Sequence, residues 1–99
     1  MDALTKLDVL KSLYADPGEL DGVLDKLLDL ALSQQRGRLE RYERDLSAFE
    51  TRHGMASAEF YRRFSAGELG DNLDWFEWAG LYELREELLL RMQQLEGAS

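Results

Sequence analysis

The sequence predicts an all-α protein: a long antiparallel helical hairpin with two shorter helices, assembled into a dimeric helix bundle. Three observations predict this fold. Apolar residues recur at intervals of three and four along most of the 99 residues, and no segment alternates as a half-buried strand does. The single proline lies at position 17, so nothing after it forbids a continuous helix. The length fits one domain, residues 1–99.

The first expected helix is short and ends near Ala15. Leu7, Leu10 and Tyr14 recur at helical spacing after Thr5. A threonine side chain accepts a hydrogen bond from a free N–H group of the first helical turn. Thr5 is therefore the expected N-cap.

The second expected helix is the longest element and spans residues 17–53. Asp16 is a favourable N-cap, Pro17 suits the first helical position, and Gly54 supplies the left-handed residue at which many helices end. At 1.5 Å per residue this helix is about 55 Å long. If the helix breaks, the break falls at Gly37, beside a polar run, and the monomer then closes on itself.

An apolar stripe follows the second helix in alternating steps of four and three residues, as a coiled-coil seam does. We expect other helices to shield it, and the second helix is too long for one short chain to cover. A compact chain of this size has a radius of gyration of only about 13 Å. A homodimer is therefore the favoured expectation, and a docked protein of another kind is the alternative. The predicted dimer seam consists of Leu28, Leu32, Leu39, Tyr42, Leu46 and Phe49.

Two further helices are expected in the second half of the chain. Ser57 is the expected N-cap of a short helix that ends at Leu69-Gly70. Asp71 is the expected N-cap of a longer helix that ends at Gly97. In an antiparallel arrangement, the arginine-rich end of the second helix lies beside the acidic start of the fourth. Such exposed pairs contribute only about 0–1 kcal/mol each, but they favour one alignment.

Charge narrows the possible partners. The net charge is -8, from 20 acidic and 12 basic side chains, and an acidic surface repels nucleic-acid phosphates. Residues 1–35 carry seven acids and three bases, residues 36–63 carry five acids and seven arginines, and residues 64–99 carry eight acids and two arginines. Because acids are interleaved with the arginines, pairing with a neighbouring helix is favoured over a nucleic-acid patch. We expect a basic protein partner and no direct nucleic-acid binding.

The sequence lacks the parts of an enzyme site. It has no cysteine, and its one histidine, His53, has no glutamate three residues before it, as a di-metal helix bundle would require. No glycine-rich loop follows a strand to hold a phosphate. We therefore expect no catalytic residue, no cofactor and no metal. The lack of cysteine, of a secretory segment and of a membrane-spanning run favours a cytoplasmic protein.

The most unusual stretch places Trp75, Phe76 and Trp78 among carboxylates. On a helix the two tryptophans share a face, and Phe76 points about 100° away from Trp75. Two interpretations are open. In one, the tryptophans pack against the aromatic residues of the third helix as a closed cluster. In the other, they anchor a basic partner and the carboxylates form a rim. The partner-binding residues are then Asp71, Asp74, Trp75, Glu77 and Trp78.

The block FYRRFSAGELGD at residues 60–71, with Asp74, Glu77-Trp78 and Leu81-Tyr82 after it, resembles a motif of small helical prokaryotic proteins. These proteins are commonly encoded beside a putative toxin gene and are treated as antitoxin-like. The similarity extends over most of the chain, including the long helix before the block.

The resemblance implies a non-enzymatic protein that neutralises a basic partner of the RNase type, and it brings no catalytic residues. The chain has no recognisable DNA-binding module, unlike antitoxins that also repress their own operon. The alternative function is a structural coiled-coil adaptor or assembly subunit whose contact surface is the seam. A di-metal or ligand-binding bundle enzyme ranks last.

Overall fold

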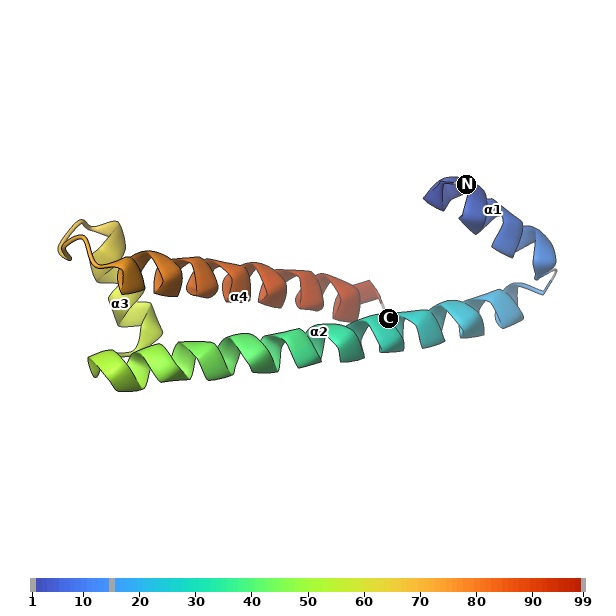
Figure 1. Cartoon of the computed structure of the whole chain (residues 1–99). Helices are drawn as coiled ribbons and strands as arrows, with labels where there is room; N and C mark the ends of the chain where they lie inside the picture. The colour runs from blue at the N-terminus through green and yellow to red at the C-terminus, as the bar shows by residue number, and fades with distance from the viewer. Residues whose placement is uncertain (1, 15, 99) are drawn as a thin grey trace.

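The computed structural model describes residues 2–14 and 16–98, which form four α-helices and no strand. The all-helical prediction is therefore confirmed for this part of the chain. α4 lies alongside α2 and runs in the opposite direction, and α3 crosses the end of this pair (Figure 1). The helices are α1 (Ala3–Leu13), α2 (Pro17–His53), α3 (Ser57–Ser65) and α4 (Leu73–Ala98).

The predicted bounds of α2 are confirmed. The Asp16 carboxylate accepts a hydrogen bond from the N–H of Gly18 at 2.9 Å, and Pro17 is the first helical residue. At the other end, Gly54 is left-handed, with φ 66°, and its N–H donates to the carbonyl of Glu50. The helix continues through position 37, so the alternative of a break that lets the monomer close on itself is wrong.

The predicted start of the first helix is wrong. Asp2, not Thr5, is the N-cap of α1, and its carboxylate accepts a hydrogen bond from the N–H of Thr5 at 2.7 Å. Aspartate is a somewhat better N-cap than threonine, so the earlier residue starts the helix. The helix ends at Leu13, with Tyr14 as its C-cap, and Ala15 lies outside the described residues.

The predicted bounds of α3 are also shifted. Ala56 occupies the N-cap position, while the backbone N–H of Ser57 donates to the Glu50 carboxylate at 2.7 Å. A side chain of α2 thus accepts the hydrogen bond of a backbone N–H at the N-terminus of α3. The helix ends at Ser65, four residues before the predicted end, because Gly67 turns the chain in a left-handed conformation with φ 72°.

α4 begins at Leu73, two residues after the predicted cap at Asp71. The Asn72 side chain accepts a hydrogen bond from the N–H of Asp74 at 2.9 Å, and this bond fills the capping role. At its other end the helix passes the predicted stop at Gly97 by one residue.

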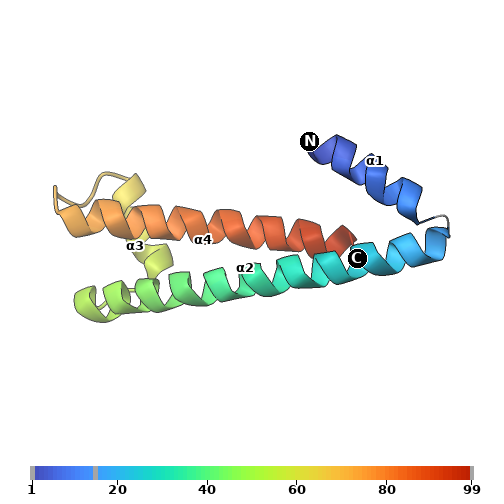
Figure 2. The ribbon, with the colours of Figure 1, turned by 45° about the vertical axis from the view of Figure 1, so that its right-hand side comes forward.

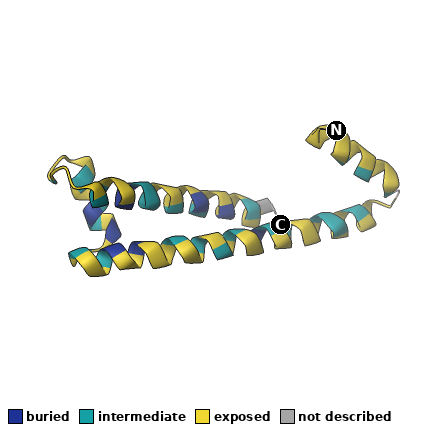
Figure 3. Cartoon of the chain, in the orientation of Figure 1, coloured by how far each residue is buried: buried dark blue, intermediate teal, exposed yellow. Residues whose placement is uncertain are grey.

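The core lies where α2, α3 and α4 meet, at one end of the molecule (Figure 3). Its members are apolar side chains that three different helices bring together. Further along the α2–α4 pair, Leu32, Leu88 and Met92 are also buried. The core cluster consists of Leu46, Phe49, Phe60, Trp78 and Ala79.

Ion pairs join α2 to α4, and the pair of Arg52 with Asp74 has the polarity that the sequence predicts. Arg52 contacts Asp74 at 3.0 Å, and Glu43 contacts Arg85 at 3.3 Å. Together with the stacking of Phe49 on Trp78, these pairs fix the register of the two helices. In this register α4 reaches its end beside about residue 29 of α2.

The first turns of α2 therefore extend beyond α4, and α1 folds back from them without lying along α4 (Figures 1 and 2). None of the residues of α1, all of which the structure describes, is buried. The molecule is consequently elongated, with extents of 60 × 23 × 19 Å and a radius of gyration of 19.5 Å. A compact chain of this length would have a radius of gyration of about 13 Å.

Replacing Gly37 with alanine should raise the free energy of unfolding by about 0.5–1 kcal/mol, because glycine is unfavourable inside a helix. An added Cβ at this position meets no atom within 4 Å. Urea unfolding followed by circular dichroism measures the change. Gly54→Ala is the opposite control, since its positive φ makes alanine strained there. A destabilised Gly37→Ala variant would contradict a continuous α2.

Candidate functional site

Trp78 belongs to the core and is not exposed. Its ring stacks on Phe60 with centroids 3.9 Å apart and an interplanar angle of 3°, and it stacks on Phe49 at 5.7 Å. Its indole N–H donates to the Ser57 hydroxyl at 2.9 Å, which satisfies the one polar atom of the buried side chain. The tryptophan is fully buried, so no partner reaches it while the fold is intact.

His53 is held between the two tryptophans at the end of α2. Its ring centroid lies 4.6 Å from that of Trp75 and 5.5 Å from that of Trp78. Its Nε2 lies 2.9 Å from a carboxylate oxygen of Asp74, which Arg52 also contacts. These hydrogen bonds, first from Arg52 and then from His53, lower the pKa of the Asp74 carboxyl.

The predicted partner-binding residues therefore divide into two groups. Trp78 and Asp74 serve the fold, and Trp75 is half-buried against Phe60 and His53. Asp71 and Glu77 are exposed, and neither forms an ion pair with another residue of the described ranges 2–14 and 16–98. The tryptophans pack as the closed-cluster interpretation expects.

An exposed apolar stripe runs along the outer side of the first half of α4. Leu73 is 84% exposed and Phe76 is 58% exposed, and Leu84 is also exposed. Steps of three, four and four residues place them on one side of the helix with Gly80 between them. An added Cβ at Gly80 meets no atom within 4 Å, so there is open space beside the helix there. We call Leu73, Phe76, Gly80 and Leu84 the outer α4 stripe.

Carboxylates border this stripe at its start. Glu77 is a surface neighbour of Leu73 and Gly80, because residues three and four apart adjoin on a helix. Asp71 precedes the helix by two residues. Phe76 keeps an edge-on contact with Phe64 of α3, with ring centroids 5.7 Å apart, which fixes the direction of its exposed face. The stripe thus combines a positioned aromatic ring with unpaired negative charge.

This stripe was not predicted, although its signal is present in the sequence. Two aromatic faces were expected on the fourth helix, and the partner contact was expected on the tryptophan face. In the structure that face enters the core, and Phe76 remains outside. The three-four-four spacing of Leu73, Phe76, Gly80 and Leu84 in the sequence would have indicated a stripe on that outer side.

The residues of the predicted dimer seam differ in how far the single chain covers them. Leu32, Leu46 and Phe49 are buried in the single chain. Leu28, Leu39 and Tyr42 are only partly buried. The single chain thus already buries three of the six residues that a second copy was expected to cover.

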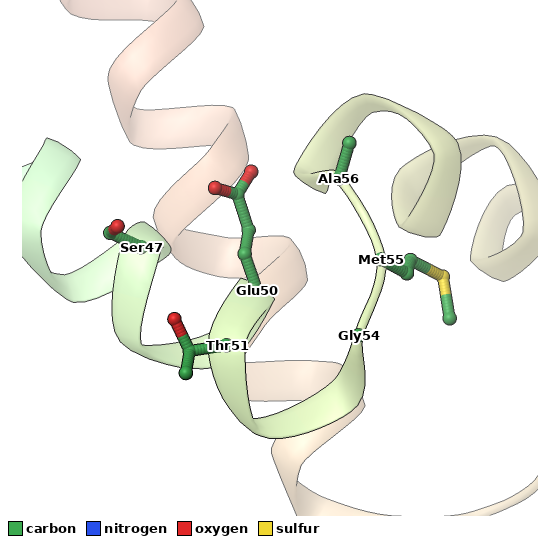
Figure 4. Close-up of a pocket in the computed structure, with 6 residues that line it drawn as sticks. All are labelled: Ser47, Glu50, Thr51, Gly54, Met55 and Ala56. Carbon is green, nitrogen blue, oxygen red and sulfur yellow. The ribbon is translucent and has the colours of Figure 1, made fainter.

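A shallow cavity of about 390 Å³ lies where α2 ends and α3 begins (Figure 4). The one ionisable side chain that lines it is Glu50, whose carboxylate accepts the N–H of Ser57. The cavity therefore presents no free acid or base to a ligand. Its lining residues are Ser47, Glu50, Thr51, Gly54, Met55 and Ala56.

The described residues contain no group of three or more histidines, cysteines or carboxylates that could hold a metal ion. Within the same part of the chain, no helix has both the length and the apolar character needed to cross a membrane. Comparison with protein families, with curated proteins and with solved structures finds no match for this chain.

Replacing Asp74 with asparagine should destabilise the protein more at pH 6 than near pH 3. The folded chain lowers the pKa of Asp74 below its ordinary 3.8. The ionised group therefore favours folding above that value, and this stabilisation is lost as the pH falls through the folded pKa. Urea unfolding at both pH values measures the difference. Asp71→Asn is the matched control, and an equal loss at both pH values would contradict the assignment.

Proposed function

We propose that this protein is a non-enzymatic binding module that neutralises a basic protein partner, as an antitoxin neutralises its toxin. The supporting observation is the outer α4 stripe, where Leu73 and Phe76 are exposed beside the unpaired carboxylates of Asp71 and Glu77. Exposed apolar surface with a polar rim is typical of protein interaction sites.

The stripe has the features of an anchoring contact. Phe76 is a large apolar group whose orientation is already fixed by Phe64, so little side-chain entropy is lost when a partner covers it. Gly80 leaves room for a partner backbone to approach the helix closely. Asp71 and Glu77 favour a lysine- or arginine-rich surface over an acidic one and speed the encounter with it.

Neutralisation by this route needs no chemistry. An RNase-type toxin presents a basic cleft to RNA, and an acidic helical protein bound there excludes the RNA by occupying the cleft. The net charge of -8 gives the chain a field suited to that role, in the reducing cytoplasm that the absence of cysteine favours. The resemblance of the block at residues 60–71 supplies the candidate partner, namely the product of a neighbouring toxin gene.

Phe76→Ala should weaken binding to that basic partner by about 30-fold, or about 2 kcal/mol, as expected for an interface anchor. The chain should keep its helicity, because Phe76 is 58% exposed. The affinity is measured by isothermal titration calorimetry on the two purified proteins, and toxin rescue is scored as growth on co-expression. Trp78→Ala instead should unfold the chain, at a cost of about 3–5 kcal/mol.

Leu90→Ala is the matched control, because Leu90 is exposed on the same helix but lies outside the outer α4 stripe. The Leu90→Ala variant should bind the basic partner with the affinity of the native chain and should rescue growth equally well. Equal affinity of the partner for the Phe76→Ala variant and for the native chain would show that the outer α4 stripe is not the binding surface. A neighbouring gene product that neither binds the native chain nor arrests growth would rule out the antitoxin-like function.

Homodimerisation through a side of the α2–α4 pair belongs to the alternative function, that of an assembly subunit, because a second copy there would cover Leu84 of the outer α4 stripe. Phe49 and Glu77 line one shallow cavity of about 370 Å³ on a side of the α2–α4 pair. Tyr42 lies seven residues before Phe49 on α2, and Leu84 lies seven residues after Glu77 on α4. Residues seven apart share a side of a helix, so Tyr42 and Leu84 lie on the same side of the pair as this cavity. Tyr42 is a predicted seam residue that remains partly exposed, so a second copy would cover it there.

Sedimentation equilibrium should give twice the chain mass of 11.4 kDa for the native protein. Leu84→Asp should return the mass to that of a single chain, since a charge buried at the interface costs more than the contact contributes. Leu90→Asp, about 120° further around α4, should leave the dimer intact. A native chain that sediments as a monomer, or a Leu84→Asp variant that remains a dimer, would exclude this arrangement.

A further inference from the structure

The end of the molecule opposite the core carries a second uncovered surface. Because α4 ends beside about residue 29 of α2, the first three turns of α2 have no part of α4 alongside them (Figures 1 and 2). These turns span about 18 Å at 1.5 Å per residue. We call α1 together with residues 17–29 of α2 the N-terminal arm.

The N-terminal arm exposes more apolar surface than an isolated end of a chain needs. Leu4 is 75% exposed and Leu13 is 70% exposed on α1, and Val9 and Leu27 are exposed as well. A helix of 11 residues such as α1 is only marginally stable in water without a packed face. A partner that covers the apolar side chains of the arm should therefore lower its free energy and stabilise α1.

The charges of the arm indicate what binds. Asp21, Asp25 and Asp29 follow one another at four-residue spacing and form a line along α2. Within the ranges 2–14 and 16–98, none of the three forms an ion pair. Like charges at this spacing repel one another, so a positive partner relieves a repulsion as well as making new contacts. Leu24 and Leu28 adjoin the line, three residues after Asp21 and Asp25.

We propose that the N-terminal arm binds an amphipathic helix of a basic partner. The apolar side of that helix packs on Leu24, Leu27 and α1, in the space along α2 that α4 leaves uncovered. Its lysine or arginine residues pair with Asp21, Asp25 and Asp29 at the border. Recognition of a helix by apolar anchors at three- and four-residue spacing, with charges at the edge, is a common mode of peptide binding.

A second copy of this chain fits the arm poorly. Residues 1–35 carry seven acids against three bases, so two arms laid together repel each other. The arginine-rich stretch of α2 has the opposite charge, but its large apolar side chains, such as Leu39 and Tyr42, are at least partly buried. No large apolar side chain is exposed between Leu30 and Leu73 in the described chain. A basic amphipathic helix supplies both the charge and the apolar face.

This inference takes the basic character of the partner from the proposed function and adds a second contact at the other end of a molecule 60 Å long. A homodimer formed through the side of the α2–α4 pair leaves the arm free. The test below uses synthetic peptides, so its outcome does not depend on whether a toxin is the partner.

The probe is a fluorescently labelled amphipathic peptide of leucine and lysine at heptad spacing, and its counterpart has glutamate in place of lysine. Fluorescence anisotropy with the full-length protein should show binding of the lysine peptide only. The triple variant Asp21→Asn, Asp25→Asn, Asp29→Asn should weaken that binding by about tenfold. Leu27→Gln should weaken it too, and Leu90→Gln should not.

The matched control for net charge is the triple variant Glu40→Gln, Asp45→Asn, Glu86→Gln, which removes three exposed carboxylates outside the arm. It should bind the lysine peptide as the native chain does. Equal weakening by both triple variants would show non-specific attraction to an acidic protein and would overturn the proposal. Binding of the lysine peptide that persists in Phe76→Ala separates the arm from the outer α4 stripe, whereas loss of binding there would place the peptide on the stripe.

A second copy as the occupant is tested by mass. If the second copy were the occupant, neutralising Asp21, Asp25 and Asp29 would raise the sedimentation mass, because the repulsion between arms is removed. The proposal expects the mass to remain that of the native protein. A raised mass that Leu27→Gln then reverses would assign the arm to self-association.

Discussion

Trp78 lies where three helices meet, and its environment holds the rest of the structure in place. Its ring is stacked between Phe60 of α3 and Phe49 of α2, and its indole N–H is satisfied by Ser57. α3 is only nine residues long, and further contacts attach it on either side, from Phe64 to Phe76 of α4 and from the Ser57 N–H to Glu50 of α2. Aromatic side chains bury more apolar surface than other side chains do, and Trp78 buries its surface at the junction of the three helices.

The location of that ring also decides which part of the molecule is left to bind others. Once the tryptophan face of α4 enters the core, the opposite face must point outward, and it carries Leu73 and Phe76. The same packing positions His53 and Asp74, so the carboxylate nearest the tryptophans is occupied within the fold. The orientation of α4 about its own axis therefore determines two features. It leaves the outer α4 stripe exposed, and it brings Asp74 to Arg52 and His53.

The helical character and the bounds of α2 could be predicted because each depends on local chemistry. Asp16, Pro17 and Gly54 act on their own neighbours, and spacing alone reveals a helix. The starts of α1 and α3 could not be placed because several residues compete to cap a helix, and Glu50 reaches α3 from another element. The choice between the two aromatic faces depends on how α3 packs, so periodicity identified both faces without ranking them.

The unequal lengths of α2 and α4 divide one continuous helix between two environments. The later turns of α2 are locked into the core, whereas its first turns are stabilised chiefly by their own backbone hydrogen bonds. A helix of this kind opens from its free end inward, at a free-energy cost that rises toward the core. Amide protons in the first turns thus exchange with solvent by fraying, and those near Phe49 exchange only when the whole domain unfolds.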